Sequence, residues 1–210
     1  MRVNLVAVKL TCAAVAVSTC LSSAATAQSL IQQPGRHPKY AVELEPHALL
    51  TPFSPPGDTS GPGLGLGGRA TIVIEDDGFI STINDSVAIG FGLDWVRYFD
   101  SNLGAGPCAH WGRGPGGQPI CRRIDGVGGD ASYFYLPAVL QWNFWLHQEW
   151  SVFAEPGLAL YLQSRDIDGS VNFGVSPLLH VGGRWHFSDW AALTARIGYP
   201  AWSVGVSFFL

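Results

Sequence analysis

Charged residues are scarce in this chain of 210 residues. Asp, Glu, Lys and Arg together make up 13% of it, about half of the share that is usual in soluble globular proteins. Lysine occurs only at Lys9 and Lys39, and the formal net charge is −4. A binding surface for a nucleic-acid backbone needs clustered basic residues. The composition therefore excludes nucleic-acid binding and does not fit an ordinary soluble domain.

Long apolar runs are also missing, although 47% of the residues are hydrophobic. A membrane-spanning helix needs about 20 consecutive apolar residues. Residues 131–148 contain no charged residue and approach that length, but Pro137 interrupts them and Gln141 and Asn143 are strongly polar. A bundle of membrane helices is therefore the weaker interpretation of this stretch, and a strand is expected there.

The first 27 residues have the pattern of a secretory signal peptide. Arg2 and Lys9 form a charged start, residues 10–21 are apolar, and residues 25–27 form a small-residue cleavage site. One alternative is an N-terminal membrane anchor, for which the apolar stretch is short. Another is a lipoprotein acylated at Cys20, where the preceding threonine fits poorly. We expect an exported chain that begins with a flexible segment, residues 28–38.

Cysteine is rare as well, with four residues in the chain. Cys12 and Cys20 fall in the signal peptide, which leaves Cys108 and Cys121 in a loop rich in Gly and Pro. An even pair in an exported protein predicts one disulfide, which would close part of the outer loop 99–131 and add about 3 kcal/mol of stability. A metal site made of Cys108, His110 and Cys121 would lack a fourth ligand, so we expect no metal and no cofactor.

What the chain does have is strict alternation of apolar and small or polar residues. In the last ten residues, Trp202, Val204, Val206, Phe208 and Leu210 share one face, and this period of two is typical of a β-strand. Eight segments of strand length follow one another: 39–50, 62–74, 86–98, 132–146, 150–163, 173–187, 190–199 and 201–210.

The even number of segments and their short and long connections predict an all-β fold. It is an eight-stranded antiparallel up-and-down transmembrane β-barrel over residues 39–210, with the N and C termini in the periplasm. The connection 75–85 is long for a periplasmic turn, so the pairing of the strands around it stays open.

Alternation also separates two faces. The outward face carries aromatic residues near both strand ends, as the interfacial girdles of membrane barrels do: Tyr40, Trp95, Phe144, Trp150, Trp185, Phe187, Tyr199, Trp202 and Phe208. The opposite face carries the charges of the strands: Glu43, Glu45, His47, Arg69, Asp94, Glu155, His180, Arg184, His186 and Arg196.

These charges should point into the barrel, because an Arg on the lipid face at mid-bilayer costs about 2–4 kcal/mol. The interior of an eight-stranded barrel is only wide enough for side chains. We therefore expect the acids and bases to pair across the lumen and close it. The alternative is a water-soluble barrel whose charged face is its exterior.

In strand number, girdles and an apolar-aromatic last strand, residues 39–210 resemble the small outer-membrane barrels of the OmpA transmembrane domain and OmpX group. Leu210 stands where these barrels usually end in Phe. The resemblance implies the outer membrane of a Gram-negative bacterium, with outer-membrane lipid and lipopolysaccharide around the barrel and insertion by the barrel assembly machinery. It implies no particular activity.

No catalytic residue is expected. His186 and Ser188 match the His-x-Ser spacing of the lipid A deacylase family, but no Glu follows Ser188, and this serine falls in a predicted periplasmic turn. We expect a structural or adhesive role, or that of a subunit in a larger complex, with a possible protein partner at the outer loops. A small pore, or a lipid-binding or lipid-modifying barrel, is the alternative.

Overall fold

The computed structural model describes residues 29–56, 61–99, 108–124, 130–165 and 171–210, and within 108–124 it describes the side chains of residues 112–120 only. The predicted signal peptide, residues 1–27, lies outside the described residues. In the described part of the chain no helix could cross a membrane.

Eight strands close into one antiparallel barrel, in the order β1-β10-β9-β8-β7-β6-β3-β2. Each begins and ends within three residues of the range that alternation predicts, which confirms the predicted fold class. The bounds are β1 Val42–Thr51, β2 Gly63–Glu75, β3 Asp85–Tyr98, β6 Ala131–Trp145, β7 Trp150–Arg165, β8 Val171–Ser188, β9 Ala191–Tyr199 and β10 Trp202–Phe209.

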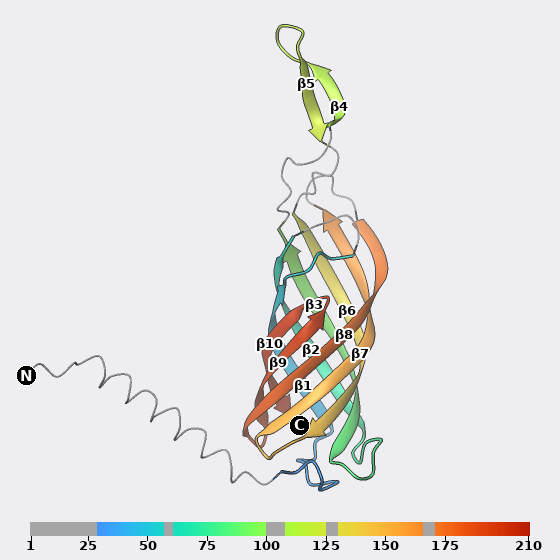
Figure 1. Ribbon diagram of the computed structural model, residues 1–210, viewed down its shortest axis with the longest axis vertical. Helices are drawn as coiled ribbons and strands as arrows, with labels where there is room; N and C mark the ends of the chain where they lie inside the picture. The colour runs from blue at the N-terminus through green and yellow to red at the C-terminus, as the bar shows by residue number, and fades with distance from the viewer. Residues whose placement is uncertain (1–28, 57–60, 100–107, 125–129, 166–170) are drawn as a thin grey trace, which may run out of the picture.

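Two further strands, β4 (Cys108–Arg113) and β5 (Pro119–Ile124), form a separate hairpin. It stands beyond one end of the barrel, opposite the end where the C-terminus lies (Figure 1). We call these the hairpin end and the terminal end. The sequence predicts an outer loop over residues 99–131, and it did not predict the two strands that the structure has there.

The predicted disulfide falls in this hairpin. In the backbone register Cys108 pairs with Ile124 and Cys121 pairs with Trp111, so the two cysteines are not opposite each other. The side chains of both cysteines lie outside the described residues. The disulfide therefore stays a prediction.

The strand register sets the width of the barrel. Asn172 of β8 has a partner residue on β7, that residue has a partner on β6, and so on around the barrel. After one full circuit, this series of partners returns to β8 at Gly182, ten residues from its start. The sheet is thus staggered by ten residues on closure. Strand number and stagger together fix the diameter of a barrel, and at eight strands the interior holds side chains and little else.

The pairing around residues 75–85, which the sequence left open, is regular. β2 pairs with β3 over its whole length, with one bulge between Val73 and Glu75. The turn that follows β2 is therefore long, but no strand is mispaired.

The hairpin end of the interior is packed with tyrosines. The rings of Tyr98, Tyr133 and Tyr135 are buried and stack or meet edge to face, with centroids 5.0 and 5.7 Å apart. The hydroxyls of Tyr98 and Tyr135 lie 3.2 Å apart, and Tyr133 donates a hydrogen bond of 2.7 Å to the carbonyl of Pro56. These contacts fill the interior between β3, β6 and the segment after β1.

At the terminal end, the segment before β1 packs against the barrel. The backbone N–H of Leu30 bonds to the carbonyl of Leu146 at 2.9 Å, and that of Asn84 bonds to the carbonyl of Ile31 at 2.7 Å. The His37 ring stacks on buried Trp145, with centroids 5.2 Å apart. The sequence predicts a flexible segment over residues 28–38, which stays a prediction; in the structure, residues 29–38 include turns and lie against this end.

Two glycines of the barrel wall differ in the space available for a side chain. A Cβ on Gly157, which faces inward on β7, would overlap the carbonyl oxygen of Ala138 and lie 2.8 Å from Cγ1 of Val139. A Cβ on Gly183, which faces outward on β8, would meet only the carbonyl oxygen of Ser151, at 3.8 Å.

We predict that Gly157→Ala lowers the free energy of unfolding by about 1–3 kcal/mol, because the methyl group overpacks the interior. Gly183→Ala, the matched control on the outward face, should leave stability unchanged or slightly raised. Urea unfolding of both variants in lipid vesicles measures the difference. Equal stability of the two variants would contradict this packing.

Candidate functional site

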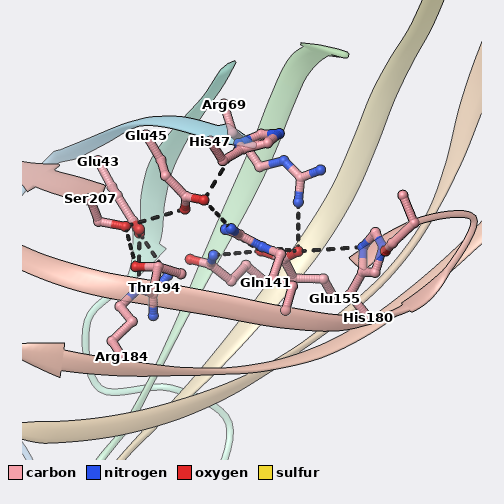
Figure 2. Close-up of polar contacts among 12 residues, drawn as sticks. Glu43, Glu45, His47, Arg69, Gln141, Glu155, His180, Arg184, Thr194 and Ser207 are labelled. Carbon is pink, nitrogen blue, oxygen red and sulfur yellow. Dashed lines mark hydrogen bonds and ion pairs between the residues drawn. The ribbon is translucent and has the colours of Figure 1, made fainter. Parts of the chain in front are cut away.

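The ten charged or titratable residues that alternation places inward all lie buried inside the barrel. They come from β1, β2, β3, β7, β8 and β9 and meet near the middle of the interior, where Figure 2 shows most of them with their contacts. Two, Arg184 and Glu155, are 0% exposed. Water is thus replaced around them by other side chains.

The carboxylate of Glu155 is the centre of this arrangement. It accepts hydrogen bonds from Nη1 of Arg69 at 2.6 Å and from Nε of Arg196 at 2.9 Å, and Nε2 of Gln141 donates to it at 2.7 Å. One carboxylate on β7 therefore binds guanidinium groups from β2 and β9 at once. Figure 2 shows the side chains of Arg69 and Gln141 pointing toward this carboxylate.

Arg196 also contacts a second carboxylate. Its Nη1 is hydrogen-bonded to Oε1 of Glu45 on β1, and the other oxygen of Glu45 accepts a bond of 3.2 Å from the hydroxyl of Ser207. Arg196 thus links Glu155 with Glu45 across the interior.

A separate ion pair lies toward the terminal end. Arg184 on β8 binds Glu43 on β1 through two parallel hydrogen bonds, 3.1 Å from Nε and 2.8 Å from Nη2, and donates a third to Asn143 at 2.8 Å. Such a two-bond fork is the strongest geometry for an Arg and a carboxylate. The guanidinium groups of Arg184 and Arg196 lie over the ring of Phe153, 4.2 and 5.0 Å from its centroid.

The third contact lies toward the hairpin end. Nε2 of His47 is 2.9 Å from Oδ1 of Asp94, and its Nδ1 is 3.5 Å from Oε1 of Glu45. Arg69 reaches Asp94 as well, at 3.9 Å. His47 and Arg69 therefore join Asp94 to the Glu155 cluster.

The two remaining histidines take other partners. His180 bonds through Nε2 to the carbonyl of Ala201 at 2.9 Å. Nε2 of His186 is 2.9 Å from the hydroxyl of Ser151, and its ring packs against Trp145 and Phe209. His186 thus contacts Ser151 rather than Ser188, the other residue of the His-x-Ser motif.

Little open space is left among these side chains. A cavity of about 10 Å³ is lined by His47, Arg69, Asp94 and His180 together with apolar residues, which is room for about one water molecule. Within the described residues, no group of three or more His, Cys, Asp or Glu side chains is placed to bind a metal ion.

Alternation identified the charged residues of this site but not the polar and aromatic residues that complete it. Gln141, Asn143, Ser151, Phe153 and Ser207 are buried and bind or pack against the charged groups. Each has the inward parity of its strand. The same periodicity could therefore have placed them in the interior, although it could not have assigned their partners.

Most of the predicted aromatic girdle lies on the outer surface. Trp95, Trp150, Trp185, Phe187 and Trp202 are exposed there, and Phe144, Tyr199 and Phe208 are half-exposed. Tyr40 differs from the prediction, because its ring packs against Phe209 and Trp145 with centroids 4.7 and 6.4 Å away. Tyr40 precedes β1, so the alternation of that strand does not fix its direction.

The fold and this site define a class: an eight-stranded antiparallel barrel with an apolar exterior and an ionic interior. Similar solved structures include Neisserial surface protein A, at 17% identity over 80% of this chain and 96% of that one, with a TM-score of 0.46. They also include Ail, the attachment invasion locus protein of Yersinia pestis, in complex with the heparin analogue sucrose octasulfate, at 10% identity, 81% and 97% coverage and a TM-score of 0.45.

A third similar structure is the Yersinia pestis outer membrane protein Ail in a phospholipid bilayer nanodisc. It is 11% identical, with a TM-score of 0.41, over 82% of this chain and all of that one. No protein-family model and no curated protein matches the chain.

We predict that Glu155→Gln lowers the free energy of unfolding by about 3–5 kcal/mol, because it leaves two buried guanidinium groups short of a counter-charge. Asp76→Asn is the control, since Asp76 pairs with Lys39 at 3.9 Å on the surface, and such pairs contribute about 0–1 kcal/mol. Urea unfolding in lipid vesicles compares the two. If Glu155→Gln lowers the free energy of unfolding no more than Asp76→Asn does, the central role of Glu155 is refuted.

We further predict strong coupling between Glu43 and Arg184. Glu43→Ala and Arg184→Ala should each be severely destabilising, while the double variant should cost less than their sum by about 0.5–3 kcal/mol, because it leaves no unpaired buried charge. A double-mutant cycle measured by the same unfolding assay tests this. Additive losses would show that the pair does not act as a unit.

Proposed function

We propose that this protein is an integral outer-membrane β-barrel with a lumen closed by its own ion pairs. The observation that carries the proposal is the inverted polarity of the barrel. Large apolar side chains such as Leu158, Leu93 and Val204 are 58%, 54% and 57% exposed on the outer wall, while Arg184 and Glu155 are fully buried inside. Water favours the opposite arrangement, and a bilayer favours this one.

In this proposal the barrel spans the membrane, and the girdle aromatics lie at its two interfaces. The terminal end faces the periplasm, and the β4–β5 hairpin projects from the cell. The chain is exported by residues 1–27 and inserted by the barrel assembly machinery into a membrane of phospholipid and lipopolysaccharide.

A closed lumen argues for a structural or adhesive role, or for a subunit of a complex, because nothing passes through the barrel. The partner would then bind at the outer loops, where a disulfide between Cys108 and Cys121 would hold the hairpin. This role is not enzymatic. The pore alternative is disfavoured by the filled interior, since the cavity inside has room for about one water molecule.

We predict that the purified protein gives no single-channel conductance in planar bilayers. In the part of the chain that the structure describes, salt bridges and packed tyrosines fill the interior, so we expect no continuous water path for an ion. A porin inserted into the same membranes serves as the positive control. Steady conductance steps that scale with the amount of this protein would overturn the closed lumen and favour the pore.

We also predict that nitroxide labels at positions 158 and 204 collide with oxygen dissolved in lipid and not with a water-soluble nickel chelate. A label at Gln148, in the exposed turn before β7, should show the reverse. The measurement is electron paramagnetic resonance on protein in lipid nanodiscs. Labels at 158 and 204 that are open to the chelate would rule out the membrane placement.

A further inference from the structure

The connection between β2 and β3, residues 76–84, folds back over the outside of the barrel. Asp85 and Val87 share the outward parity of exposed Trp95 on β3, yet they are only 1% and 0% exposed. The burial of these two outward residues shows that other atoms cover the wall here, and Trp142 of β6 lies opposite Val87 in the register. The hydrogen bonds of Asp85 identify the atoms that contact it.

The carboxylate of Asp85 holds the turn in place. Its Oδ2 accepts hydrogen bonds from the backbone N–H groups of Phe79 at 2.9 Å and Ile80 at 3.4 Å, and from Nε1 of Trp142 at 2.8 Å. Gly78 has a φ of +61°, and a Cβ there would overlap the Asp85 carboxyl group. Consecutive backbone N–H groups thus form a small anion-binding cradle.

This geometry presents two apolar side chains outward. Phe79 is 63% exposed and Ile80 is 38% exposed. The Phe79 ring lies 5.8 Å from that of Trp142, which lies 4.8 Å from the ring of Phe144 in the girdle. The turn therefore extends the girdle sideways, from β6 toward β2.

The start of the turn has the opposite character. Asp76 and Asp77 carry negative charge, and Asp76 pairs with Lys39 at 3.9 Å on the surface. The segment thus has an apolar tip against the wall and a charged base at the terminal end. Segments divided in this way lie at the boundary between water and hydrocarbon.

We propose that the 76–84 turn is a membrane-interface anchor, which inserts Phe79 and Ile80 among the lipids of the leaflet at the terminal end. The partner is the surface of a phospholipid bilayer, because the exposed rings are continuous with the aromatic girdle. This inference rests on the membrane placement proposed above. Asp85 acts as a positioning residue, since its carboxylate holds the turn against the wall.

The test is a nitroxide label at position 79 in the full chain, with Cys108 and Cys121 replaced by Ser, in phospholipid nanodiscs. We expect its ratio of oxygen to nickel-chelate collisions to match that of a label at Phe187 in the girdle. Labels at Leu158 and Gln148 give the lipid and water references. A label at Ile80, measured separately, should agree with the one at 79.

The outcomes separate the two proposals. If position 79 matches Gln148 while Leu158 lies in lipid, the anchor is overturned and the membrane barrel stands. If Leu158 itself is open to the chelate, the membrane placement fails and the anchor fails with it.

The matched variants test Asp85. Asp85→Asn keeps the size of the side chain but removes the charge, so the label at position 79 should shift toward the Gln148 value as the turn is released. Asp77→Asn removes an exposed charge from the same turn and should cause no shift. A label at 79 that stays in lipid in Asp85→Asn would overturn the positioning role of this carboxylate.

Discussion

The shared carboxylate of Glu155 is the interaction on which the interior depends. Closing eight strands with a stagger of ten residues leaves room for side chains but not for the hydration shells of ions. Each charge that the strands carry inward must therefore find a counter-charge or a hydrogen bond. Glu155 forms ion pairs with both Arg69 and Arg196, and Arg196 also pairs with Glu45. Loss of this carboxylate would leave buried guanidinium groups without their full counter-charge.

The interior is arranged in three layers along the barrel axis. The ionic layer lies between the tyrosines of the hairpin end and an aromatic layer at the terminal end, where Trp145, Phe209 and the His37 ring pack together with His186. The outer two layers keep water away from the middle one. In a less polar environment an ion pair is electrostatically stronger, and an unpaired charge costs more. The same packing therefore strengthens the network and makes it intolerant of single substitutions.

Alternation predicted the eight strands and the buried face, because a period of two depends only on which side of a sheet faces the interior. It could not predict partners. Arg184 and Glu43 are 141 positions apart, and their contact depends on the stagger, which no local pattern encodes. For a related reason, alternation predicted neither the inward direction of Tyr40 nor the contacts of residues 29–38 with the barrel. These residues precede the first strand, so their placement depends on rings such as Trp145 that reach the terminal end from distant strands.

A buried charge on the outer face of the barrel wall also needs a partner, and the turn after β2 supplies one. Interior carboxylates are neutralised by guanidinium groups from facing strands, but no strand faces an outward carboxylate. Asp85 instead recruits N–H groups from Phe79, Ile80 and Trp142, and doing so draws the turn onto the wall. The length of this connection, unusual for its side of the barrel, thus has a physical cause. A shorter turn could not reach back to Asp85, and the carboxylate would then lose both backbone donors and keep only Trp142.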